Sequence, residues 1–230
     1  MKLRSCLTLS SLLFIVFSVN AQKHTTILEA GVNTSWVSIT NGGRFDNANT
    51  LTSYQFGLTW DKHLSKSAYL QSGIHYTGKG AKMQLGEENQ DAIWYKSTSN
   101  PFYLEIPLNI VLKCTGSSKV KCFAGTGPYI AFGVGGKNKV EGKMDNTYFK
   151  SEDKIKFTDE EQGAVLPLPD LAGFPNMHRM DYGFNILAGV ECQKLVFRAQ
   201  YGYGLAKLAP GYEDDKNKMR VLSFTLGMKL

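Results

Sequence analysis

Residues 102–113 read FYLEIPLNIVLK, and apolar side chains occupy every second position of this stretch. Successive side chains of a β-strand point to opposite faces, so a period of two indicates a strand with one apolar face. At about 3.3 Å per residue and a tilt near 40°, these roughly 11 residues span about 25 Å, the height of the apolar band of a membrane-spanning barrel. Its apolar face consists of Phe102, Leu104, Ile106, Leu108, Ile110 and Leu112.

The same alternation recurs along the rest of the chain. Glycine is frequent (23 residues), aromatic residues make up 12% and proline is scarce (7 residues), which favours strands and tight turns over helices. Together with residues 102–113 the repeats give eight strands, an even number that closes a meander. The other alternating segments are residues 28–36, 54–61, 70–77, 122–130, 182–190, 195–205 and 221–230.

The connections between these strands alternate in length, and this alternation favours one of two arrangements. Short turns on one rim and long loops on the other are typical of outer-membrane barrels, whose apolar faces point outward. We therefore predict an all-β, eight-stranded antiparallel up-and-down transmembrane β-barrel. The alternative is a soluble secreted barrel that encloses its apolar face and binds a small ligand, as lipocalins do. Short links are residues 61–68, 114–119 and 191–194; long links are residues 37–51, 79–99, 133–180 and 206–219.

The first residues have the pattern of an export signal. Lys2 and Arg4 precede an apolar stretch at residues 7–19, and a small-x-small sequence ends at Ala21. We expect a signal peptide over residues 1–21 and one barrel domain over residues 22–230. The apolar stretch is too short to cross a bilayer as a helix, and no later stretch approaches 18 apolar residues.

Charge and motifs exclude several classes of function. The formal charge is +6, of which Lys2 and Arg4 contribute two, and acids and bases interleave without a basic run, so we expect no nucleic-acid partner. No nucleophile triad, paired carboxylate motif or metal-ligand spacing is present, so we predict neither an enzyme nor a metal or cofactor protein. His75 falls on a polar strand face and is interpreted as structural.

Four charged residues fall on the polar faces of different strands: Glu29, Glu105, Lys121 and Arg198. If these faces line the interior, the charges must pair, because an unpaired buried charge is costly. We expect a polar network that plugs the lumen. The alternative, a path for protons or ions, needs more room than eight strands enclose.

Two further features leave alternatives open. Cys114, Cys122 and Cys192 lie near the short-turn rim, where an exported protein can form one disulfide. We favour a Cys122–Cys192 bridge, or no bridge, over Cys114–Cys122. The loop at residues 134–179 is either an extracellular contact for a partner or a cap packed on its own barrel.

Several segments resemble the PorT-type outer-membrane β-barrel family. The resemblance rests on the signal peptide, the strand YLEIPL at residues 103–108, and R-x-D-Y-G-x-N at 179–185 followed by G-x-E at 189–191. It implies an eight-stranded barrel in the outer membrane of a Gram-negative cell, with both termini in the periplasm. Most members have no assigned activity, and the namesake is linked to type IX secretion. One departure is the end of the chain, where Leu230 replaces the aromatic residue of many such barrels.

These observations predict a non-enzymatic protein of the cell outer membrane. Its role would be structural or based on interactions through extracellular loops and periplasmic turns. Outer-membrane lipid is the expected surrounding, and proteins of the envelope or of a secretion system are the expected partners. The alternatives are an accessory role in protein secretion and the soluble lipocalin-like binder. The sequence leaves the oligomeric state open.

Overall fold

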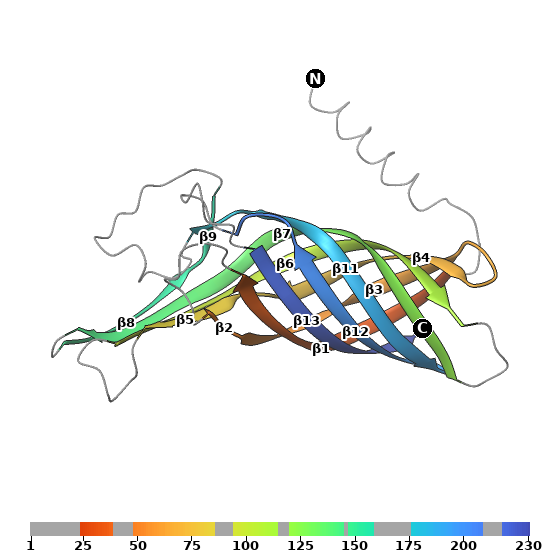
Figure 1. Cartoon of the computed structure of the whole chain (residues 1–230), viewed down its shortest axis with the longest axis horizontal. Coiled ribbons are helices and arrows are strands. Elements are labelled where there is room, and N and C mark those ends of the chain that lie inside the picture. Colours follow the sequence, from red (N-terminus) through yellow and green to blue (C-terminus); the bar gives the residue numbers. More distant parts are fainter. Residues whose placement is uncertain are drawn as a thin grey trace, which may run out of the picture.

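Eight long antiparallel strands form a closed ring in the computed structural model, which describes residues 24–38, 48–85, 94–114, 120–144, 147–158, 176–208 and 218–230 (Figure 1). Each strand pairs with the next, and the last pairs with the first, for example Leu226 with Ala30. The predicted all-β ring of eight is confirmed. In order around the ring the strands are β1 (His24–Ser38), β3 (Leu51–His63), β4 (Ala68–Gly78), β6 (Trp94–Lys113), β7 (Val120–Met144), β11 (Met180–Cys192), β12 (Leu195–Gly204) and β13 (Lys218–Lys229).

The side chains of the ring point as an outer-membrane barrel requires, with the apolar faces outward and the polar faces inward. On β6, Leu104, Ile106 and Leu108 are 39%, 42% and 49% exposed, whereas Glu105 and Asn109 are 7% and 1% exposed. The same alternation of exposed apolar and buried polar residues runs along β11 and β13. An apolar exterior around a polar interior excludes the lipocalin-like alternative, which needs the reverse.

The short connections gather at one rim of the ring. β3 and β4 are joined through residues 64–67, and β11 and β12 through Gln193 and Lys194, where Gln193 adopts a left-handed backbone (φ 54°). The C-terminus lies at the same rim, because the backbone N–H of Leu230 donates to the carbonyl of Thr26 at 2.9 Å (Figure 1). The predicted signal peptide, residues 1–21, lies outside the described residues. Nowhere in the described ranges does a helix of membrane-crossing length and apolarity occur.

At the opposite end, β6 and β7 continue as a pair of antiparallel strands well beyond the other ring strands (Figure 1). β5 (Ala81–Leu85) pairs with the extended part of β6, and β2 (Ala48–Asn49) pairs with β5. β8 (Thr147–Lys154) pairs with the extended part of β7. We call this projecting part of β5, β6, β7 and β8 the outer sheet.

The outer sheet corrects two predicted loops. Residues 79–99 and 134–179 were predicted as loops, but much of each is paired strand. Residues 96–100 read KSTSN, and a segment that is polar on both faces lacks the contrast from which a period of two is recognised. A register shift at Phe102/Tyr103, opposite Gly133 and Gly135, marks the point where the outer sheet begins.

Candidate functional site: a charged interior and an outer lysine face

Charged side chains point into the interior of the ring, and Lys79, the residue directly after Gly78 at the end of β4, is one of the buried cations. Its Nζ lies 2.8 Å from Glu105 on β6 and 2.7 Å from Asp181 on β11. Tyr129 on β7 donates a hydrogen bond to Asp181 at 3.3 Å, and its ring lies 4.5 Å from the Lys79 Nζ. Asn185 donates to the other oxygen of Glu105 at 3.3 Å. The cluster therefore ties β4 to three other strands through fully or nearly buried groups.

A second cation, Lys113, occupies the interior near the short-turn rim. Its Nζ contacts Glu191 on β11 and lies 2.5 Å from Asp61 on β3. Lys229 at the end of β13 lies 2.5 Å from the second oxygen of Glu191. Gln71 donates to Asp61 at 2.7 Å, so each carboxylate has more than one donor. Multiple donors to a buried carboxylate are what makes its burial tolerable.

Between these two clusters, Glu29 on β1 meets Arg198 on β12. The guanidinium lies 3.0 Å from the carboxylate, and both side chains are almost completely buried. Thr225 on β13, the strand between them, donates to Glu29 at 3.4 Å. His75 lies nearby and shares a hydrogen bond of 2.9 Å with Thr59, consistent with its structural interpretation.

The structure places three of the four predicted interior charges in this network and one elsewhere. Glu29 and Arg198 pair directly, and Glu105 belongs to the Lys79 cluster. Lys121 is corrected: it lies one residue inside the start of β7, and its side chain is exposed at the rim. The prediction missed Lys79 and Lys113, although Lys113 is the last member of the polar face of residues 102–113.

One small cavity lies among the buried polar side chains of the interior. The internal cavity that Lys79, Glu105, Tyr129 and Asn185 help to line has a volume of about 10 Å³, which is room for about one water molecule. Above it, toward the outer sheet, a buried apolar layer covers the network. This layer includes residues of β9 (Lys156–Phe157) and β10 (Asn176–Met177), so part of the predicted 134–179 loop packs as a cap. Its members are Val37, Ala81, Met83, Ile155, Met177, Leu208, Met219 and Val221, with Phe157 packed against them.

The outer sheet has one strongly basic face. Strand register places Lys96 opposite Glu141, Glu141 opposite Lys150, and Lys139 opposite Glu152. Residues opposite each other, or two apart on one strand, share a face, so seven lysines and two glutamates lie together. Lys82 on β5 belongs to this face because Thr98 lies opposite both Lys82 and Lys139. We call this set the lysine face: Lys82, Lys96, Lys137, Lys139, Glu141, Lys143, Lys150, Glu152 and Lys154.

The two glutamates of the lysine face each lie between lysines. Glu152 is 2.6 Å from Lys137 and 3.4 Å from Lys139, and Glu141 is 3.5 Å from Lys96 and 3.9 Å from Lys150. Hydrogen bonds from Lys137 and Lys139 lower the pKa of Glu152, so its carboxylate is charged at neutral pH. Even with both glutamates charged, the lysine face keeps an excess of five positive charges.

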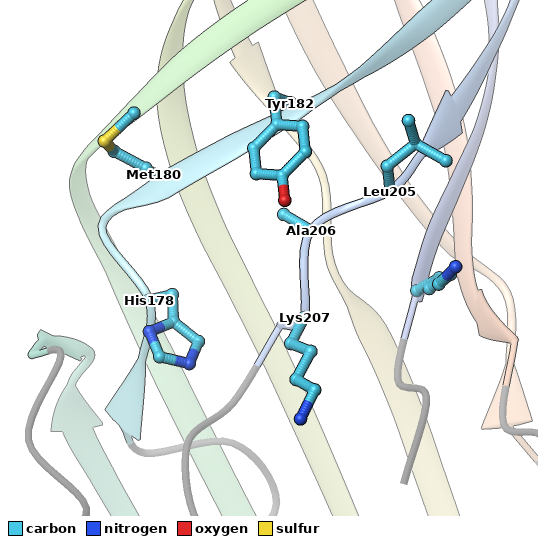
Figure 2. A pocket seen from close by; sticks show the side chains of 7 residues that line it. His178, Met180, Tyr182, Leu205, Ala206 and Lys207 are labelled. Carbon is cyan, nitrogen blue, oxygen red and sulfur yellow. The ribbon is translucent and has the colours of Figure 1, made fainter.

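A surface pocket of about 550 Å³ lies where β11 begins and β12 ends, as Figure 2 shows. Among its lining residues are one histidine, one tyrosine and two lysines but no carboxylate. In the described part of the chain no three metal-ligating side chains gather. The lining consists of His178, Met180, Tyr182, Leu205, Ala206, Lys207 and Lys218.

Three of the four cysteines fall within the described residues, and they lie on the exterior at the short-turn rim. Cys114, Cys122 and Cys192 are all exposed and free in this structure. The register sets Cys122 opposite Val190 and Cys192 opposite Val120, so the two cysteines of the predicted bridge are diagonal neighbours rather than opposite each other.

A comparison with models of protein families agrees with the ring, its polar interior and its apolar exterior. The family model described as "Outer membrane protein beta-barrel domain" matches residues 20–209. The chain belongs to this outer-membrane β-barrel family. The protein is therefore placed in the outer membrane, as the sequence predicted.

The chain is also similar to several solved structures, all of them distant in sequence. Neisserial surface protein A is 10% identical, with 90% of this chain and 99% of that chain covered and a TM-score of 0.42. Outer Membrane Protein W of E. coli is 15% identical, with 92% and 100% covered and a TM-score of 0.42. OprG of Pseudomonas aeruginosa is 13% identical, with 90% and 94% covered and a TM-score of 0.41. No curated protein matches the chain significantly.

Proposed function

We propose that the protein is a transmembrane, non-enzymatic barrel that acts by binding an anionic partner on the lysine face of its outer sheet. The observation that carries the proposal is the excess of five positive charges on one face of a sheet projecting beyond the ring. Lysines that only kept the sheet soluble would need no such bias, because interleaved charges serve that purpose.

The position of the lysine face supports an interaction at the cell surface. The apolar exterior of β6 includes Leu104 to Leu112, whereas the lysine face begins on the other side of the register shift at Phe102. The outer sheet lies at the rim opposite the short turns and the C-terminus, which is the extracellular side in barrels of this type. The lysine face would therefore meet partners outside the cell.

The filled interior supports an interaction role over conduction. Three ion-pair clusters cross the lumen and an apolar layer covers them. An eight-stranded barrel is just wide enough for its side chains. We expect planar bilayers containing the protein to show no steady large-channel conductance, and such a conductance would contradict this part of the proposal.

Binding of a sulfated polymer by the protein in lipid nanodiscs tests the lysine face. Dextran sulfate is the probe and uncharged dextran is the control ligand. The triple variant Lys139→Gln, Lys143→Gln, Lys150→Gln should weaken binding about tenfold, since an exposed charge contact is worth up to about 0.5 kcal/mol. The weakening should diminish at high salt because screening already reduces the interaction.

A matched variant removes the same charge from the opposite rim. Lys66, Lys121 and Lys194 are exposed there, and replacing all three by glutamine should leave dextran sulfate binding unchanged. Equal losses in both triple variants would show attraction to net charge alone and would overturn the assignment to the lysine face. Absence of binding by the unaltered protein would overturn it as well.

The resemblance to PorT-type barrels leaves a second prediction, an accessory role in protein secretion. That role would use the short-turn rim and a partner in the periplasm. The secretome of a deletion strain tests it: loss of a defined set of exported proteins would favour the secretion role over binding on the lysine face.

A further inference from the structure

The short-turn rim carries a cluster of thiols on three adjacent strands. Cys114 directly follows β6, Cys122 is the third residue of β7, and Cys192 is the last residue of β11. All three are exposed on the outward face. The structure gives the register of these strands, which the sequence alone did not provide.

The register places Cys114 directly opposite Cys122. Lys113 pairs with Phe123, and the backbone N–H of Cys114 donates to the carbonyl of Cys122 at 2.9 Å. Opposite residues of a hydrogen-bonded antiparallel pair have Cα atoms about 5.5 Å apart. This separation falls within the range of about 4.4–6.8 Å found in disulfides. Both side chains also lie on the same face, as a bridge requires.

Cys192 does not satisfy the same condition toward Cys122. Cys122 faces Val190, and Cys192 faces Val120, so these two cysteines are diagonal neighbours. Diagonal Cα atoms are about 7–8 Å apart, and cysteines more than about 7 Å apart cannot be bridged without movement of the backbone. The geometry therefore selects a different pair from the one favoured by the sequence.

We propose that Cys114 and Cys122 form a disulfide in the protein in the outer membrane and that Cys192 stays a free thiol. The rim that carries them faces the periplasm, an oxidising compartment. The oxidant is a protein disulfide. The thiolate of one cysteine attacks it and releases one thiol of the donor, forming a mixed disulfide. The thiolate of the other cysteine then attacks that bond and releases the second thiol. The oxidation removes two protons and two electrons from the cysteine pair, and the donor disulfide takes them up as two thiols.

The bond would link the end of β6 to the start of β7. The two long strands that carry much of the lysine face would therefore be joined covalently at their membrane-proximal ends. The inference does not depend on what the lysine face binds.

Thiol trapping in intact cells tests the pairing. Free thiols are alkylated before lysis, the protein is purified from outer membranes, and peptides are mapped by mass spectrometry with and without reduction. We expect alkylated Cys192 and a peptide in which Cys114 is joined to Cys122. Alkylation of all three cysteines, or a peptide joining Cys122 to Cys192, would overturn the proposal.

Single variants provide an independent readout. Cys192→Ser should leave no alkylated thiol before reduction and two after it. Cys114→Ser should free Cys122, giving two alkylated thiols before reduction. Two alkylated thiols in Cys192→Ser before reduction would contradict the bridge. Heat-dependent migration on a detergent gel confirms that each variant is folded.

Discussion

The guanidinium of Arg198 lies 3.0 Å from the carboxylate of Glu29, and the two residues belong to strands that are separated by β13 in the ring. A contact of this kind passes across the interior face of the intervening strand. It fixes the relative positions of three strands with one ion pair. The contribution of such a pair to stability is clearest when one partner is removed, because the remaining charge is then buried without a partner and destabilises the fold.

Replacing Arg198 by methionine should destabilise the barrel by about 3–5 kcal/mol, because Glu29 is left buried without its cation. The double variant Arg198→Met, Glu29→Gln should recover a substantial part of this loss. Urea unfolding in micelles, followed by tryptophan fluorescence, measures both. Additive losses in the double variant would show that the two side chains do not interact.

The contribution of Lys113 to stability can be compared with that of Lys121, the lysine that the sequence analysis predicted to lie in the interior. Lys113→Met leaves Asp61 and Glu191 with fewer buried donors and should cost about 3–5 kcal/mol of stability. Lys121→Met, one strand away and exposed, should change stability by less than about 0.5 kcal/mol. The same unfolding assay compares the two. A larger effect at Lys121 would restore the original prediction and contradict the structure.

Arginine substitutions on the apolar face should have effects that depend on depth. Leu108 lies in the middle of the exposed apolar row of β6, and Leu112 lies at its end near the short-turn rim. Leu108→Arg should cost about 2–4 kcal/mol and Leu112→Arg about 0–1 kcal/mol for a barrel in a bilayer. Reversible unfolding from lipid vesicles provides the values. Near-zero costs at both positions would indicate that water, not lipid, surrounds this face.

Glycines on the interior face allow close approach of neighbouring strands. A Cβ atom on Gly127 would lie 2.1 Å from the backbone carbonyl oxygen of Leu108, whereas a Cβ atom on Gly135 would meet nothing within 4 Å. Gly127→Ala should therefore destabilise the barrel by about 1–3 kcal/mol. Gly135→Ala serves as the control and should be close to neutral. Equal stabilities of the two variants would contradict the packing around Gly127.

The ring could be predicted from the sequence because its strands contrast strongly between their two faces. Leu104, Ile106 and Leu108 alternate with Glu105, Pro107 and Asn109, and this contrast predicted the strand, whereas the lengths of the links predicted that its apolar face points outward. The length of the links predicted which rim carries the short turns. These features depend on local composition, so a single sequence contains them.

The features that could not be predicted depend on register or on segments without contrast. Lys79 follows Gly78 at the end of a strand, where no alternation shows that its side chain turns inward to Glu105. The lysine face arises only when β6, β7 and β8 are aligned, as in the pairing of Lys139 with Glu152. The position of Cys114 opposite Cys122 likewise requires the register of β6 and β7, which the sequence alone did not reveal.

The central claim is that the apolar side chains of the ring face lipid around a charged, filled interior. Spin labels at positions 104, 106, 108 and 110 of β6, in a variant without other cysteines, test it most directly in lipid vesicles. The account predicts high accessibility to oxygen and low accessibility to a water-soluble nickel complex at all four positions. High accessibility to the nickel complex, or burial from both reagents, would contradict it.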